Sequence, residues 1–339
     1  AERGARLMPP LADTQFVEAT WIMIVKSIVI FAVIFGILPV LTVVERKLIG
    51  RFQHRYGPNR VGPFGLMQPL ADVGKLISKE AFRPENAVST LFILGPLLPV
   101  LSGVLAIAII PWGDTQMGVG FYGIDVPIGI LYFFAVGSIA FYGLLLGGWS
   151  SGSKYSLLGA MRSAAQLISY EVAMGLALLG VIMMSGSLSL VSIVHSQGAI
   201  WFVVPQFVGF LIFMLAGFAE TNRTPFDMPE ADAELVQGFM TEYGGMRFGS
   251  FLLVEYMEIL VVSGIAAAMF LGGWMGPGPS WLDPIWMLAK MLGLVLVFIW
   301  VRATLPRLRY DQLMSLGWKV LLPLATLNVL VTAILVVVT

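Results

Sequence analysis

The sequence changes character abruptly where WFVVPQFVGFLIFMLAGFA (residues 201–219) runs into ETNRTPFDMPEADAEL (residues 220–235). The first stretch carries no charge, whereas six carboxyl groups lie between Glu220 and Glu242. An apolar run of this length is typical of a helix that crosses a membrane. Acidic groups that follow it directly must be hydrated, neutralised or used for a function.

Composition places the whole chain in the same class. It has 339 residues, of which 58% are hydrophobic and only 12% are charged, and its mean hydropathy is +0.88. Such a chain cannot cover a globule with polar surface, so its solvent must be largely lipid. Because lipid offers no hydrogen bonds to the backbone, we predict an all-α polytopic membrane protein that forms a single membrane domain over residues 1–339.

Eight apolar runs are long enough to cross about 30 Å of hydrocarbon. They lie near residues 21–44, 88–110, 127–148, 157–183, 201–219, 250–272, 284–304 and 319–338. The segments 45–87, 149–156, 220–249 and 305–318 hold 13 of the 20 lysines and arginines, whereas the loops that follow the second, fourth and sixth runs hold none. By the positive-inside rule the basic segments are inner loops, and an even number of spans places both termini on the outer side.

Metal and thiol chemistry is not expected in this chain. It has no cysteine and only two histidines, which excludes disulfides, thiolate-bound zinc and a cysteine-ligated iron–sulfur cluster. A haem or a histidine metal site is also not expected, so we predict no metal site.

The acidic segment has a recognisable local pattern. Asp227 and Glu230, with Pro229 between them, resemble a capping box that begins a helix at about Met228. On that helix Glu230 and Glu234 share the face of Asp227, while Asp232 points away. Capping accounts for two of the six acids and leaves the others unexplained.

A surface helix is expected from Pro63 to about Lys79. Its polar stripe contains Gln68, Asp72, Lys75 and Lys79, and its opposite side is apolar. One interpretation is an interfacial helix whose charges meet lipid phosphates. The other is a charged stripe that faces a protein partner or a water-filled passage.

Three acids fall inside predicted spans. Glu171 lies about 21 Å along its helix from Leu157, near mid-membrane, and Glu255 and Glu258 follow in the sixth span. A structural carboxylate is the simpler interpretation of each. An acid within the membrane is nevertheless a functional candidate by default, and three of them indicate a polar track.

Two smaller patterns concern packing. Residues 112–126 are rich in glycine and turn-forming residues and predict a hairpin or turn-rich cap on the outer side. Gly143 and Gly147 form a pair of small residues that we expect to pack helices inside this chain. Lys26 and Lys290, near outer span ends, are expected to extend toward the outer interface.

Several motifs occur in the order of a known family. They are ERKL (45–48), GPNRVGPFG (57–65), QPLAD (68–72), GWSSGSKY (148–155), RSAAQLISYE (162–171), AETNRTPFD (219–227) and RATLPRLRYDQLM (302–314). Together they resemble the quinone-chamber membrane subunit of respiratory complex I, also called the H subunit or chain 1. The resemblance extends from the first span to the eighth.

The resemblance implies a membrane subunit of proton-pumping NADH:quinone oxidoreductase. Such a subunit closes the quinone tunnel against the peripheral arm and begins the proton path. Quinone, as ubiquinone or menaquinone, is the implied substrate, while FMN and iron–sulfur clusters are expected only in partner subunits. The implied partners are the peripheral-arm subunits, the other membrane-arm subunits and the lipid bilayer, with no nucleic acid. The implied location is a bacterial plasma membrane or the mitochondrial inner membrane.

Residue roles follow from the same resemblance. The proton path is implied to use Glu171, Glu220, Glu230, Asp232, Glu234, Glu242 and Glu255. The quinone chamber and the interface with the peripheral arm are implied to use Arg46, Arg60, Asp72, Lys75, Arg223, Phe226, Asp227 and Arg302. Asp232 stands where the family commonly has glutamate, and the third span lacks the acid that the family often carries there.

Other functions remain open at the level of sequence. Homologous subunits serve membrane-bound hydrogenases and related dehydrogenases, where no quinone need bind. A stand-alone ion transporter predicts an internal inverted repeat, which this sequence does not show. A passive anchor for a peripheral enzyme does not require Glu171 or Glu255 inside spans.

Overall fold

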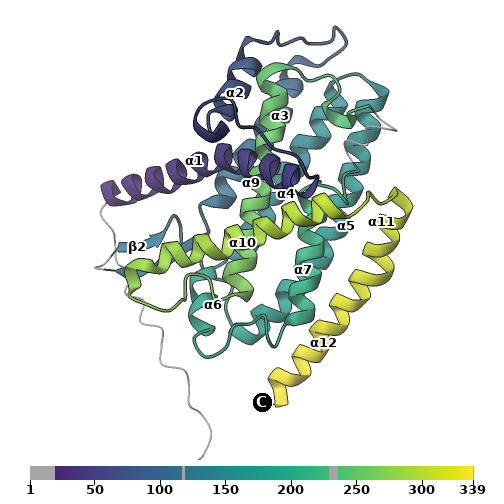
Figure 1. The fold of residues 1–339 in the computed structure, drawn as a ribbon. Helices are drawn as coiled ribbons and strands as arrows, with labels where there is room; N and C mark the ends of the chain where they lie inside the picture. Colours follow the sequence, from purple (N-terminus) through teal and green to yellow (C-terminus); the bar gives the residue numbers. More distant parts are fainter. Residues whose placement is uncertain (1–19, 117–118, 229–235, 339) are drawn as a thin grey trace, which may run out of the picture.

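The computed structural model describes residues 20–116, 119–228 and 236–338, and these residues form helices and one β-hairpin (Figure 1). The long helices are α1 (Thr20–Phe52), α3 (Ser89–Ile107), α4 (Gly129–Ser150), α5 (Lys154–Ser185), α9 (Gly245–Phe270), α10 (Asp283–Thr304) and α12 (Leu322–Val338). The short ones are η1 (Pro63–Gly65), α2 (Gln68–Ser78), α6 (Leu190–Ser196), α7 (Phe207–Glu220), η2 (Gly238–Met240), η3 (Ser280–Leu282) and α11 (Tyr310–Leu316), and the π-helical turn η4 (Gly317–Leu321) joins α11 to α12.

The predicted all-α membrane fold is confirmed. In the described residues, seven helical segments are long and apolar enough to cross a membrane, and α7 is a shorter apolar helix. Each of the eight predicted apolar runs overlaps one of these helices. The chain is therefore a multi-pass membrane protein.

Helix α7 is shorter than the predicted span 201–219. Its 14 residues rise about 21 Å, less than a hydrocarbon core of about 30 Å. The residues before it form turns that are held to other elements: the Val203 amide donates to the Phe270 carbonyl, and the Phe202 amide donates to the side chain of Gln197. These tertiary bonds give the backbone of residues 201–206 partners outside a helix.

Helix α1 is longer than its predicted span. It continues past residue 44 to Phe52, so the start of the predicted inner loop 45–87 is helical. No proline interrupts this part of the sequence before Pro58, and helical geometry therefore persists until turns begin at Gln53. The basic end of the first span consequently stands on a rigid element.

The predicted surface helix begins later than Pro63. Residues 63–65 form the separate turn η1, in which Phe64 and Gly65 have positive φ, and α2 begins at Gln68. A side chain at position 65 would approach the Pro58 carbonyl oxygen to 2.2 Å, so this turn requires glycine. The prediction of a helix with one polar face holds from Gln68 to Ser78.

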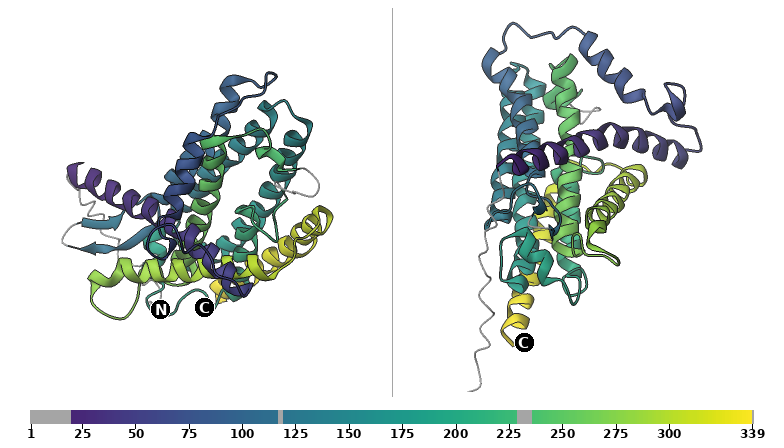
Figure 2. Two further views of the ribbon diagram at one scale, coloured as in Figure 1. Left: turned by 45° about the horizontal axis from the view of Figure 1, so that its top comes forward. Right: turned by 90° about the vertical axis from the view of Figure 1, so that its left-hand side faces the viewer.

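Helices α3, α4 and α9 form an upright bundle, and α1 crosses it at a steep angle (Figures 1 and 2). The closest packing is between α3 and α4. A Cβ at Gly143 would lie 2.2 Å from Pro99 Cδ, and Gly147 faces Gly95. The prediction that Gly143 and Gly147 pack helices within this chain is therefore confirmed.

The two sets of predicted loops gather at opposite ends of the bundle. At one end the hairpin of β1 (Pro111–Gln116) and β2 (Val119–Tyr122) approaches α6, with His195 3.4 Å from Asp114. At the other end the Val88 amide donates to the Ser150 carbonyl, and the Leu308 amide donates to the Pro225 carbonyl. The hairpin predicted within residues 112–126 is confirmed, and its place on the outer side stays a prediction.

Candidate functional site

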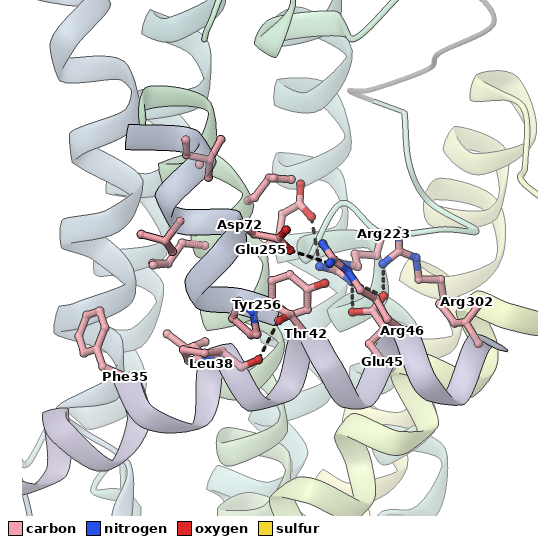
Figure 3. A pocket seen from close by; sticks show the side chains of 18 residues that line it. Phe35, Leu38, Thr42, Glu45, Arg46, Asp72, Arg223, Glu255, Tyr256 and Arg302 are labelled. Atoms are coloured by element: carbon pink, nitrogen blue, oxygen red, sulfur yellow. Dashed lines mark hydrogen bonds and ion pairs between the residues drawn. The ribbon is translucent and has the colours of Figure 1, made fainter. Parts of the chain in front are cut away.

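A cavity of about 530 Å³ lies between α1, α2 and α9, beside the loop that follows α7 (Figure 3). Its volume is within the range of small-molecule sites. The apolar end is lined by Phe35 and Leu38 of α1, and the charged end lies near Glu45. Since ten residues of helix separate Phe35 from Glu45, the two ends are about 15 Å apart. We refer to this cavity as the chamber.

The charged end of the chamber is a buried ion cluster. Arg223 donates to both carboxylate oxygens of Glu45, at 2.8 and 2.9 Å, and its other terminal nitrogen is 3.3 Å from Glu255. Arg302 pairs with the same Glu45 carboxylate. The guanidinium of Arg223 also stacks over Tyr256, 4.1 Å from the ring centroid. Two acids thus face two arginines, with Glu45 only 2% exposed.

Arg223 stays charged in this setting. Burial alone would lower the pKa of its guanidinium, but the neighbouring carboxylates of Glu255 and Glu45 more than offset that effect and raise the pKa. The loop that presents Arg223 is itself packed: Phe226 is buried against Tyr170, and its carbonyl accepts a hydrogen bond from Gln166 at 2.8 Å. The start of the acidic segment is therefore a fixed wall of the chamber.

Helix α2 supplies a second charged contact. Arg46 of α1 donates to Asp72 at 2.6 Å, and Gln68 donates to the other oxygen of Asp72 at 3.0 Å. Partial desolvation would raise the pKa of Asp72, but these hydrogen bonds and the charges of Arg46 and Lys75 outweigh it and lower the pKa. Asp72 lines the chamber, so part of the polar stripe faces a cavity, as the second interpretation of this helix expects.

A second group of acids lies deeper in the bundle, where Glu171 of α5, Glu220 at the end of α7 and Glu255 and Glu258 of α9 each keep part of their surface accessible. Glu171 is within hydrogen-bonding reach of Ser138 and interacts electrostatically with Glu220. Glu220 Oε2 is buried without a hydrogen-bond partner in the described part of the chain. A cavity of about 10 Å³ is lined by Glu255 and Glu258 of α9 together with Asn222 and Leu144. The predicted polar track thus has its members near one another.

Glu171 and Glu220 belong to the deeper acids, and the other predicted site residues fall into three groups. The chamber is lined by Arg46, Asp72, Arg223, Glu255 and Arg302. Away from the lining lie Arg60, which is exposed, Phe226, which is buried, and Lys75, Asp227 and Glu242. The residues Glu230, Asp232 and Glu234, together with the capping box and the helix expected from Met228, lie outside the described residues.

Glu45 and Tyr256, which contact Arg223 at the charged end of the chamber, were not predicted as site residues. Glu45 carried a usable signal, because it is the only acid in the strongly basic segment 45–60 and follows directly on an apolar run. A lone acid there predicts a partner for arginine. Tyr256 carried no such signal, since its contact with Arg223 joins segments far apart in the sequence.

The two lysines expected to extend toward the outer interface have partners within the protein. Lys290 donates to the carbonyls of Leu271, Gly273 and Met275 at 2.7, 2.8 and 2.7 Å and stacks over Trp201. It therefore satisfies the carbonyl groups at the end of α9. Lys26 lies 3.4 Å from the Gly120 carbonyl, against the hairpin.

Comparisons with known proteins place this site in context. Residues 25–333 match the family model described as NADH dehydrogenase. The chain is 53% identical to the NADH-quinone oxidoreductase H subunit 1 of Geobacter metallireducens over 312 residues, which cover 91% of this chain and 94% of that protein. It is 52% identical to the H subunit 2 of Geobacter sulfurreducens with the same coverage. The H subunit of Thermomicrobium roseum is 48% identical over 90% of this chain and 93% of that protein.

Proposed function

Because the chain belongs to the H-subunit family of NADH-quinone oxidoreductase, the respiratory complex I family, we propose that the chamber binds quinone and that the acids beside it begin the proton path. The observation that carries this proposal is the position of Glu255. Its side chain lines both the chamber and the small cavity that leads to the deeper acids. One carboxyl group is thereby placed between a substrate-sized space and the membrane row.

The lining of the chamber suits an amphipathic quinone. The apolar end, with Phe35, Leu38 and Leu252, matches an isoprenoid tail. The charged end, with Arg223, Arg302 and Tyr256, offers donors to the oxygens of a headgroup. The chain has no cysteine to hold an iron–sulfur cluster, so electrons reach the quinone from partner subunits.

Reduction of the headgroup changes the charge beside the ion cluster. Two electrons make the quinone oxygens basic, and protons are drawn from nearby acids. Because the carboxyl groups are close together, their titrations are coupled, and a change at Glu255 alters the protonation of Glu220 and Glu171. We assign Glu230, Asp232, Glu234 and Glu242 to the same path on the family resemblance.

The inner segments are proposed to dock onto the peripheral arm. Tyr56, Phe64 and Phe82 are 78%, 80% and 63% exposed in the segment between α1 and α3. Aromatic groups this exposed, next to the basic residues of that segment, are typical of a surface that another protein covers. Arg60 and Lys75 lie on this same segment.

Blocking the chamber tests its role in quinone binding. Thr42 lines the middle of the chamber, whereas Val40, on the same helix, is 50% exposed and lies outside the lining. We expect Thr42→Trp to raise the KM for quinone about tenfold or more, the effect of losing about 1.4 kcal/mol of binding. Electron transfer from NADH to ferricyanide, which the peripheral arm serves, should be unchanged.

Val40→Trp is the matched control, because it adds the same bulk to the same helix outside the chamber. It should keep the wild-type KM for quinone. If both tryptophan variants have the same KM for quinone and keep their ferricyanide activity, the chamber is not the quinone site.

A further inference from the structure

Glu258 is an acid without an assigned role in the path described above. It follows Glu255 by three residues on α9, which places it on nearly the same face and about 4.5 Å deeper. Its neighbours Met257 and Ile259 are 0% and 3% exposed, whereas Glu258 keeps accessible surface. That surface faces the small internal cavity.

The small cavity gives Glu258 a connection to the chamber. Glu255 and Glu258 line it together, and only Glu255 of the two also lines the chamber. A volume of about 10 Å³ is close to the room that one water molecule needs. A proton can therefore pass between the two carboxyl groups over a single water.

Glu258 also interacts with Glu220, the next acid of the proposed path. It interacts electrostatically with Glu220 as well as with Glu255. Glu220 lies at the end of α7 beside Gly137 of α4, with its Oε1 3.9 Å from where a Cβ of that glycine would stand. Glu258 is thus electrostatically linked to both the acid at the chamber wall and the buried acid beyond it.

Helix α4 cannot supply this link. Between Gly129 and Ser150 it contains no ionisable acid or base other than tyrosines. At the small cavity it contributes only Leu144, and at Glu171 it contributes the hydroxyl of Ser138. The carboxyl group near the middle of the row comes from α9 instead.

A purely structural role explains Glu258 poorly. A buried carboxylate is normally held by a cation. Arg223, the cation that interacts electrostatically with Glu258, already forms ion pairs with Glu45 and Glu255. Three neighbouring carboxyl groups, Glu220, Glu255 and Glu258, then share the remaining charge of one guanidinium, and such a cluster must hold protons to avoid repulsion between like charges.

We propose that Glu258 is a proton carrier that joins Glu255 to Glu220, in place of an acid on α4. When reduced quinone takes up a proton, the O–H bond of protonated Glu258 breaks, its proton passes to the Glu255 carboxylate, and Glu255 gives that proton to the quinone oxygen. Glu258 then takes a proton from Glu220, which is reprotonated from Glu171. No electron moves in these steps. This inference rests on the proposed function of the chamber.

Replacing the carboxyl group provides the first test. Glu258→Gln, in the assembled complex in membranes, should lower NADH:quinone turnover and proton uptake at least about tenfold, because loss of a positioned proton carrier costs about 10²-fold or more when no other path exists. Ferricyanide reduction should stay at the wild-type rate. Wild-type turnover and proton uptake in this variant overturn the inference.

A rescue from α4 separates proton transfer from structure. Leu144 lines the same cavity from the opposite helix, so Leu144→Glu in the Glu258→Gln background returns a carboxyl group to the cavity. We expect recovery of at least part of the turnover and proton uptake. Leu144→Gln in the same background is the matched control and should restore neither. Equal behaviour of the two double variants overturns the inference.

A spectroscopic measurement covers the case in which Glu258→Gln does not assemble. The infrared difference between oxidised and reduced complex should contain a carboxylic C=O band that shifts in Glu258→Asp, which keeps an ionisable group. An unshifted set of bands overturns the inference. Glu255→Gln and Glu171→Gln, measured in parallel, distinguish a failure of the proposed proton path from a failure of the role of Glu258. If both variants are fully active, the proposed path itself is wrong. If both are impaired while Glu258→Gln is active, only the role of Glu258 is wrong.

Discussion

At the level of single residues, Glu45 determines whether the charged end of the chamber is balanced. Its carboxylate is shared by Arg223 and Arg302, and it is 2% exposed. Glu45→Gln leaves two arginines with one acid, and removing one partner of a buried ion pair typically costs about 3–5 kcal/mol. We expect a clear fall in the midpoint of thermal dissociation of the purified complex.

The control for Glu45 is an exposed ion pair. Arg309 and Asp311 are 3.6 Å apart, and both side chains are more than 70% exposed. Asp311→Asn should change the same midpoint little, because exposed pairs contribute about 1 kcal/mol or less. If the two variants shift the midpoint equally, the buried ion cluster stabilises the complex no more than the exposed pair does.

The residues of the site could be predicted only in part from the sequence. Arg223, Glu255 and Arg302 carried signals, because charge next to or inside an apolar run requires a partner. Which partner each would meet could not be predicted, since Glu45 and Arg302 are 257 positions apart and meet only through the packing of α1 on α10. Motif resemblance identified the right segments, and packing then decided that Arg60 stays outside the chamber while Glu45 enters it.

At the level of elements, the ion pair between Arg46 and Asp72 joins α1 to α2. The pKa of Asp72 is lowered from its ordinary value of 3.8. Because this pKa is lowered in the folded protein, the stabilisation by the Arg46–Asp72 ion pair is complete above about pH 3.8. It is lost only as the pH falls through the lowered pKa of Asp72. We therefore expect the hydrogen-exchange protection of residues 68–78 in the complex to be the same at pH 5 and pH 7.

Asp72→Asn should reduce that protection at both pH values, because it removes the charge that Arg46 meets. Protection of α9, which packs through apolar groups, provides the internal reference. If protection of α2 falls between pH 7 and pH 5 in the wild-type protein, the Arg46–Asp72 ion pair titrates in the ordinary range and holds α2 less firmly than its 2.6 Å contact indicates.

The elements themselves were predicted well where apolar length decides, and less well at their ends. Spans with uninterrupted apolar runs, such as 127–148, match their helices within two residues. The fifth span failed at its start because Gln197 and the end of α9 offer residues 201–206 other hydrogen bonds. The surface helix began late because Phe64 and Gly65 adopt positive φ. Neither tertiary hydrogen bonds nor turns of this kind change the hydrophobic periodicity of a sequence, so periodicity could not predict these helix ends.

At the level of the whole molecule, we expect the bias of lysine and arginine to set the direction in which the chain sits in the membrane. The fold supports an alternation of loops between two ends, because the Lys154 end and the Ser196 end belong to the two separate groups of connecting segments. Which end faces inward is set by charge alone. The chamber, with Arg46, Arg223 and Arg302, belongs to the basic end.

Single cysteines test this orientation without interference from the chain itself, which has none. Lys154 and Ser196 both keep accessible surface, so Lys154→Cys should react with a membrane-impermeant maleimide in inside-out vesicles and Ser196→Cys in right-side-out vesicles. The reason is that moving the basic segments across the bilayer would carry many cations with them, at a cost of several kcal/mol for each one placed in hydrocarbon. Labelling of both positions from one side would contradict the alternation of spans.

Labelling of each position from the side opposite to that expected would leave the alternation intact but invert the orientation of the whole fold. The chamber would then lie on the wrong side of the membrane to receive electrons from an inner peripheral arm.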